Sequence, residues 1–282
     1  MMRFWDTAVV RGERGETTAM QVLLRRAGGL WGVFLLLLAS SNGWAYRPFF
    51  SRDAAVTDPQ EEEIELGYFT LDQAQGKQTF TLPSLDLSYG LRRDIEVFGE
   101  FAVARDPTGA LNIVDPGLFA RAILKEGVLQ EEEGPSVAVE VGPLLPSTRP
   151  DERHVGFKAI GIVSGQVEPF TLHVNVGGGS DRTKARLSGI WGVIGELPVR
   201  QSLRLVGEVA GESTKGALPN NTVLLGVIWQ PSASEVYLDT GLRRGLSRGA
   251  ADWQFTAGVT FSFSLSSMLR GSSRSDEGRT SP

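Results

Sequence analysis

The sequence predicts a single antiparallel transmembrane β-barrel of about twelve strands, of the bacterial outer-membrane type. Three observations predict it. Apolar and polar residues alternate through most of residues 61–263, short and long connections alternate along the chain, and the final strand ends on an aromatic residue. The pattern is clearest from Trp253 to Phe263, where every second residue is apolar and the others are polar or small. That length matches the ~10 residues that a tilted strand needs to span a membrane.

Composition excludes several other classes of protein. The chain has 282 residues and a net charge of −5, which argues against a nucleic-acid-binding surface. It contains no cysteine, which excludes disulfide frameworks and thiolate metal sites and suits an exported protein. We expect no cofactor. We also expect no metal site, because His154 and His173 stand apart in the sequence without local partners.

Residues 1–45 predict an upstream extension followed by a signal peptide. Arg25 and Arg26 precede the apolar run at residues 30–39, and small residues lead to a cleavage site near Ala45. The apolar run is short for a transmembrane helix, and a retained N-terminal anchor is the alternative. Met20 is a natural start, so the preceding residues fit a misassigned start codon. Export predicts the outer membrane of a Gram-negative-type bacterium.

The exported chain divides into three parts. Residues 46–60 are predicted to form a periplasmic lead-in that can enter the lumen, residues 61–263 the barrel, and residues 264–282 a disordered tail. Pro83 is expected at a β-bulge in the second strand. An even number of strands returns both barrel ends to the periplasmic side. Connections are predicted to be tight at 92–93, 164–167, 199–201 and 230–234, and longer at 105–116, 142–154, 177–184, 211–221 and 244–252. Two connections fit this order poorly, a short one at 72–76 and a long one at 126–135.

The face opposite the apolar one is polar and predicts the lining of a lumen. Glu63, Glu65 and Asp86 lie on this face, and the candidate lumen-facing residues are Glu96, Glu100, Arg121, Lys125, Glu140, Lys158, His173, Asn175, Arg186, Glu196, Arg204, Glu208, Asp239 and Arg243. Glu96 and Glu100 on one strand face Arg121 and Lys125 on the next, and these opposed charges predict a salt-bridge ladder across a narrow barrel. Carboxylates and bases in similar numbers predict no strong ion selectivity.

Short motifs carry a resemblance over nearly all of residues 46–263. They are Arg47-Pro48-Phe49 with Asp53-Ala54, the hairpin from Ser88-Tyr89-Gly90-Leu91 to Glu96-Val97, Asp115-Pro116-Gly117, Gly142-Pro143-Leu144-Leu145-Pro146, and the terminal Gly258-Val259-Thr260-Phe261-Ser262-Phe263. Together they resemble a family of outer-membrane β-barrels labelled as transporter-like proteins of the meta-pathway of phenol degradation. The resemblance implies a monomeric channel-like barrel that passes small organic compounds, with no catalytic residues to carry over.

We therefore expect passive passage of small, hydrophobic or aromatic solutes through a narrow or partly plugged pore. The expected partners are outer-membrane lipid, a small-molecule solute, and the barrel-assembly machinery, which would engage the last strand from Trp253 to Phe263. No nucleic acid is expected as a partner.

Three alternatives stay open. A lipid-modifying enzyme needs a serine activated by a histidine, and Ser164, Ser188 and the His173–Asn175 pair are the available groups. A structural or adhesive barrel would work through its loops at residues 142–154 and 211–221. A soluble periplasmic β-sandwich would show the same alternation of apolar and polar residues.

Overall fold

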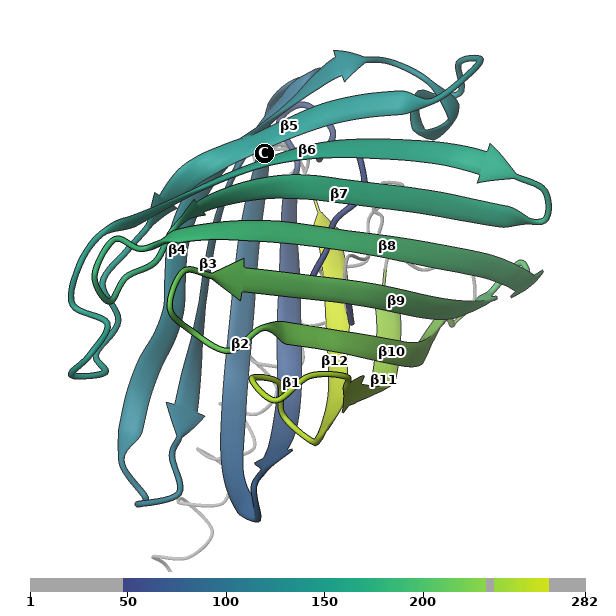
Figure 1. Cartoon of the computed structure of the whole chain (residues 1–282). Coiled ribbons are helices and arrows are strands. Elements are labelled where there is room, and N and C mark those ends of the chain that lie inside the picture. Colours follow the sequence, from purple (N-terminus) through teal and green to yellow (C-terminus); the bar gives the residue numbers. More distant parts are fainter. Residues whose placement is uncertain (1–47, 232–235, 264–282) are drawn as a thin grey trace, which may run out of the picture. The chain divides into compact units, whose positions relative to one another are not determined.

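The chain folds into a closed antiparallel β-barrel, described here for residues 48–231 and 236–263 of a computed structural model. Each strand pairs with its neighbours in the sequence, and β12 closes the barrel against β1 (Figure 1). The prediction of about twelve strands is confirmed. The strands are β1 Glu62–Ala74, β2 Lys77–Arg92, β3 Ile95–Arg105, β4 Leu111–Lys125, β5 Ser136–Leu144, β6 Gly156–Val167, β7 Phe170–Ser180, β8 Leu187–Arg200, β9 Leu203–Thr214, β10 Asn220–Trp229, β11 Val236–Gly245 and β12 Trp253–Phe263.

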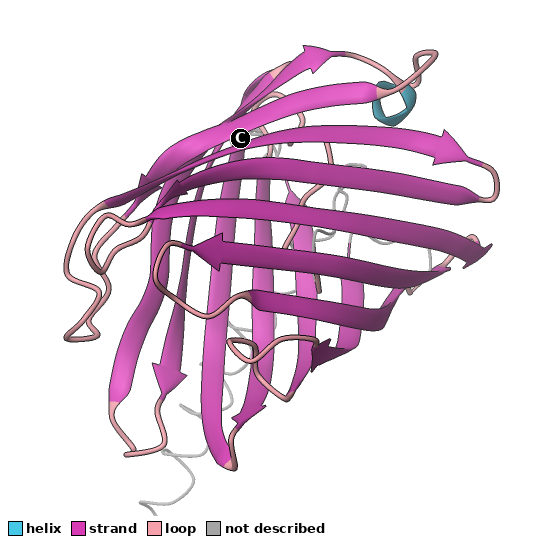
Figure 2. Cartoon of the chain, in the orientation of Figure 1, coloured by secondary structure: helices cyan, strands magenta, loops and turns pink. Residues whose placement is uncertain are grey.

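The described residues contain almost no helix. One 3-10 turn, η1 at Val128–Gln130, lies in the connection between β4 and β5 (Figure 2). No helix within residues 48–231 and 236–263 is long and apolar enough to cross a membrane. The predicted signal peptide, its cleavage site, the start codon and the tail at residues 264–282 lie outside the described residues, as does part of the connection at 230–234.

The barrel is apolar outside and polar inside. Apolar side chains on the outer face are exposed on strand after strand; Leu225 of β10, for example, is 72% exposed. On the inner face, by contrast, Glu96 and Arg121 are fully buried. A β-sandwich would bury its apolar face between two sheets, so the closed sheet with this inverted polarity rules out the soluble sandwich.

Several strands are longer than the alternation of residues predicts. The connection expected at 164–167 lies inside β6, and the turn is at residues 168–169 instead. The loop expected at 105–116 shortens to 106–110, because β4 already begins at Leu111. Beyond the apolar band a strand can be polar on both faces, so the period-two signal ends before the hydrogen-bonded ladder does.

The closing strand, β12, turns polar residues toward the lumen and apolar residues outward. Thr256 and Thr260 are buried on the inner face, while Phe255 is exposed on the outer face. Val259 lies on the same outer face by alternation but is only 8% exposed, with Leu66 and Leu238 opposite it on the two neighbouring strands. In the second strand the register shifts between Thr81 and Ser84, which confirms the bulge expected at Pro83.

Candidate functional site in the barrel lumen

Residues 48–61, here called the plug segment, cross the interior of the barrel ahead of β1 (Figure 1). At one end the Pro48 carbonyl accepts a hydrogen bond from Arg243 of β11 at 3.3 Å. At the other end Pro59 forms a bridge with Gly90 of β2. Between these points Ala54 is fully buried. The lumen is therefore occupied by the chain's own N-terminal segment.

Wall side chains hold the first half of the plug backbone. The Glu208 carboxylate accepts the backbone N–H of Ser51 at 2.7 Å. The Asn175 amide accepts the N–H of Arg52 at 3.1 Å and donates to its carbonyl at 2.7 Å. These contacts take the place that a neighbouring strand would fill in a sheet, since buried backbone groups must be paired.

The second half is held in the same way. Ser164 Oγ accepts the N–H of Ala54 at 3.0 Å. Farther along, Glu96 Oε2 accepts both the N–H of Thr57 at 2.7 Å and its hydroxyl at 3.0 Å. The plug is therefore bound through its main chain by wall residues from several strands.

Glycine makes room for the plug in the wall. A Cβ atom at Gly90 would lie 2.0 Å from the carbonyl oxygen of Asp58, and one at Gly192 would lie 1.9 Å from Ser51 Oγ. Both contacts are far shorter than van der Waals separation, so a larger residue at either position requires the plug to move.

The lumen is not uniformly polar. Ala54 of the plug packs in a buried cluster with Ala138, Ile160 and Ile162 of β5 and β6. At the other end of the plug, Phe49 packs against a second buried cluster on β9 and β10. Apolar packing therefore adds to the hydrogen bonds that hold the plug in place.

One row of charges runs across β3, β4 and β5. Arg121 lies 3.1 Å from Glu96 and 3.1 Å from Glu140, and none of the three side chains is more than 2% exposed. Lys158 of β6 extends the row to Glu140 at 3.0 Å. The predicted ladder is present in the Glu96–Arg121 pair, and because it is buried each carboxylate depends on its base.

A second charged row lies on β1, β2 and β3. Glu65 stands opposite Asp86, and Asp86 stands opposite Glu100. We call these three residues the acidic row. Their base comes from the plug: the Arg52 guanidinium contacts Asp86, lies 3.0 Å from Glu100, and stacks 4.3 Å from the centre of the Phe98 ring.

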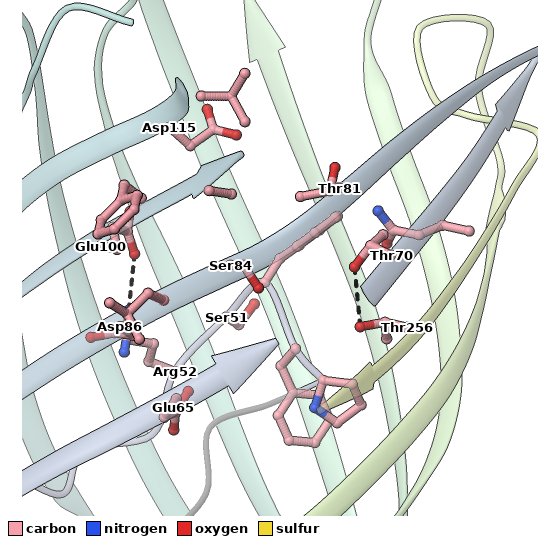
Figure 3. A pocket seen from close by; sticks show the side chains of 18 of the residues that line it. Ser51, Arg52, Glu65, Thr70, Thr81, Ser84, Asp86, Glu100, Asp115 and Thr256 are labelled. Atoms are coloured by element: carbon pink, nitrogen blue, oxygen red, sulfur yellow. Dashed lines mark hydrogen bonds and ion pairs between the residues drawn. The ribbon is translucent and has the colours of Figure 1, made fainter. Parts of the chain in front are cut away.

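A cavity of about 440 Å³ adjoins the plug. We call the barrel end at which β1 begins and β12 ends the inner end, and the opposite one the outer end. Thr70, Thr81 and Gln254, near the outer ends of their strands, line the cavity, and Phe50 and Arg52 of the plug line it from below. Figure 3 shows Arg52 grouped with the acidic row on one side of this cavity.

A buried polar relay lies on the opposite wall. His173 Nδ1 lies 2.8 Å from Ser164 Oγ, and His173 Nε2 lies 3.7 Å from Glu196. Sequence reasoning paired His173 with Asn175, but Asn175 binds the plug instead. Ser164 is fully buried, and its Oγ accepts a hydrogen bond from the backbone N–H of Ala54 in the plug. Within the described ranges, no group of three His, Asp or Glu side chains converges as a metal site would require.

No protein-family model matches the chain, and no curated protein matches it. Among solved structures, the COG4313 outer membrane channel from Pseudomonas putida F1 covers 79% of this chain and 100% of its own, at 10% identity and a TM-score of 0.52. That likeness shows a shared barrel fold. The translocator domain of the autotransporter NalP from Neisseria meningitidis covers 88% of this chain and 98% of its own at 14% identity, with a TM-score of 0.43, which is too low to support an argument.

Most of the predicted lumen residues point inward, and their side chains are buried or partly buried. They are Glu96, Glu100, Arg121, Glu140, Lys158, His173, Asn175, Glu196, Arg204, Glu208, Asp239 and Arg243. Lys125 and Arg186 were wrongly placed there. A bulge after Ile123 sets Lys125 opposite Val137 of the outer face, and its side chain is exposed.

Arg186 lies in the loop before β8, where its Nε is 2.7 Å from Asp181. Burial tends to raise the pKa of Asp181. Backbone N–H donors from Lys184 and Arg186, together with the Arg186 charge, outweigh burial and lower that pKa to about 2. This ion pair therefore orders the β7–β8 loop and contributes nothing to the lumen.

These placements change the charge balance of the lumen. With Lys125 and Arg186 outside, the bases on the described strands that face inward are Arg121, Lys158, Arg204 and Arg243. The inward carboxylates outnumber them, and they are Glu63, Glu65, Asp72, Asp86, Glu96, Glu100, Glu140, Glu196, Glu208 and Asp239. The prediction of similar numbers is wrong: the wall is acidic, and Arg52 of the plug offsets part of its charge.

Proposed function

We propose that the protein is an outer-membrane channel for passive passage of small solutes, closed at rest by its plug segment. The observation that carries the proposal is a polar lumen crossed by a segment that belongs to no strand. Hydrogen bonds to wall side chains such as Glu208 and Asn175 can be exchanged for water. A strand ladder could not be released so simply. The plug can therefore leave the lumen without breaking the hydrogen bonds between the strands of the barrel.

The apolar outer face supports a place in lipid, because exposed side chains such as Leu225 would otherwise form a large apolar surface in water. Because the number of strands is even, β1 begins and β12 ends at the same end of the barrel, as the periplasmic assembly route requires. In this proposal the signal peptide is cleaved near Ala45, and the strand from Trp253 to Phe263 engages the barrel-assembly machinery.

The solute class is part of the proposal too. The resemblance to phenol meta-pathway barrels suggests small organic compounds. Phe50 supports this, because it presents a ring that is 59% exposed and lines the cavity. A solute in the cavity can therefore contact this ring.

Planar-bilayer recording tests the proposal. Replacing residues 49–57 by a glycine–serine segment of equal length should convert a mostly closed barrel into a persistently open one. The matched control replaces the outer loop at residues 215–219 in the same way and should leave the barrel closed. If the plug replacement conducts no better than the unmodified protein, the channel proposal is wrong.

An enzyme acting on lipid is the second candidate, because Ser164, His173 and Glu196 form a relay. The relay is buried under the plug, and lipid outside the barrel has no path to it in this conformation. If it were catalytic, His173→Ala would abolish ester hydrolysis by the purified protein. We expect no hydrolysis from either form.

A further inference from the structure

We propose that the acidic row, Glu65, Asp86 and Glu100, is a binding site for small solutes that carry a guanidinium or primary ammonium group. Such a solute competes with Arg52 for the row and thereby releases the plug. This inference rests on the proposed channel function, for which it names a substrate class and a means of opening.

The register of the strands creates the site. Glu65, Asp86 and Glu100 stand directly opposite one another on three adjacent strands. Side chains in such positions lie ~5 Å apart, and like charges there repel. The row therefore needs a cation between its members.

The cation in the structure is a guanidinium group. Arg52 contacts Asp86 and reaches Glu100 at 3.0 Å, and its side chain is only 13% exposed. The Phe98 ring, 4.3 Å from the guanidinium carbon, completes the site with a cation–π contact. The row thus already binds the chemical group that we propose as its ligand, and that group belongs to the removable plug.

A second, independent feature points to a ligand. Asp86 Oδ1 is buried, and no donor in the described part of the chain hydrogen-bonds to it. Asp86, Glu100 and Arg52 also line the cavity of about 440 Å³. A solute in the cavity therefore lies beside the row while the plug is still in place. Once it displaces Arg52, it can also donate to Asp86 Oδ1, which Arg52 leaves without a donor.

The geometry favours an organic cation over a metal ion. Across the described residues, no cluster of three acidic or histidine side chains has the spacing of a metal site. A planar guanidinium spans neighbouring carboxylates with several donors, and an ammonium also donates in several directions. The exposed ring of Phe50 lines the same cavity and offers a surface for the solute's apolar part or for its charge.

Anions are disfavoured because the bases that line the cavity already have partners. Arg52 binds the acidic row, and Lys158 binds Glu140 at 3.0 Å. A neutral isostere of guanidinium could form similar hydrogen bonds but would leave the row's charge uncompensated. Charge is therefore the property that should separate effective solutes from ineffective ones.

Thiol labelling of the full chain tests the inference. The chain has no cysteine, so Ala54→Cys places a single buried thiol in the plug. Methylguanidinium should raise its rate of reaction with a maleimide several-fold and in a saturable manner. Methylurea, its neutral isostere, should not, and potassium chloride at equal concentration controls for screening. Equal rates with all three additives would overturn the inference.

Variants in the Ala54→Cys background sharpen the test. Glu100→Gln should weaken the response to methylguanidinium, whereas Asp94→Asn, in the exposed β2–β3 turn, should preserve it. Arg52→Gln should label rapidly without any solute. Resistance of the barrel to proteolysis shows that each variant is folded. A response that survives Glu100→Gln unchanged would place the solute elsewhere and contradict the site.

The two proposals fail separately. If the plug replacement conducts but methylguanidinium leaves labelling unchanged, the cation site is wrong and the channel remains. If methylguanidinium speeds labelling but no plug variant conducts, the cation site remains and the channel is wrong.

Discussion

The Glu208 carboxylate accepts the backbone N–H of Ser51 at 2.7 Å while it binds the Arg243 guanidinium, also at 2.7 Å. One buried wall residue thus satisfies both a charge of the wall and a backbone donor of the plug. When the plug leaves, water must take over the Ser51 contact, but the ion pair can stay. The wall therefore binds the plug at a defined backbone position, but the ion pair of the wall does not depend on the plug.

Gly90→Ala should open the channel. The new methyl group would lie 2.0 Å from the Asp58 carbonyl oxygen, and only movement of the plug can relieve that clash. Planar-bilayer recording should show a higher open fraction than in the unmodified protein. Gly189→Ala is the matched control, because a Cβ there meets nothing within 4 Å. Equal open fractions in the two variants would mean that the plug does not control conductance.

Arg121→Ala should destabilise the barrel strongly. It removes the base shared by Glu96 and Glu140 and leaves both carboxylates buried without it. Breaking a buried pair in this way lowers the free energy of unfolding by about 3–5 kcal/mol. Arg92→Ala is the comparison, since Arg92 is 72% exposed and its pair with Asp94 contributes at most about 1 kcal/mol. Urea unfolding in detergent measures both, and equal losses would contradict the role of the buried row.

The opened channel should prefer cations. Inward carboxylates such as Glu63 and Glu65 outnumber the inward bases, and the plug replacement also removes Arg52. In a potassium chloride gradient, the reversal potential of that variant should lie toward the potassium equilibrium value. A reversal potential near zero would mean that the lumen charges are balanced, as the sequence had suggested.

The β7–β8 loop should loosen in acid. The pKa of Asp181 is lowered to about 2 by its hydrogen bonds and by Arg186, which outweigh burial. The stabilisation is therefore fully present above about pH 4 and is lost as the pH falls from there through about 2. The protection of the Lys184 and Arg186 amides from hydrogen exchange, relative to an unfolded chain at the same pH, should therefore fall only near pH 2. In Asp181→Asn these amides should exchange faster at neutral pH. Unchanged exchange in that variant would show that the charge of Asp181 does not hold the loop.

The alternation of residues was sufficient to predict the fold because each strand carries its own period-two signal. A ladder between the carboxylates Glu96 and Glu100 and the bases of the next strand was also predictable, but only its Glu96–Arg121 pair is present, because Glu100 binds Arg52 instead. Arg52 was missed because its partners are non-local: Asp86 lies 34 residues away, and no local pattern links them. The available signal was a base, Arg47 or Arg52, in a lead-in that was predicted to enter a lumen lined by carboxylates. Lys125 was misplaced because alternation cannot reveal a bulge.

A reversible lock of the plug tests the central claim most directly. Ser51 and Gly192 are in contact, with a Cβ at Gly192 only 3.2 Å from the Ser51 Cβ, so Ser51→Cys with Gly192→Cys should form a disulfide in a chain that has no other cysteine. Conductance of this double variant should be absent when it is oxidised. On reduction it should rise above that of the unmodified protein, because the side chain at residue 192 then displaces a plug that no bond holds. Equal conductance in the oxidised and reduced forms would contradict the claim that residues 48–61 close the channel.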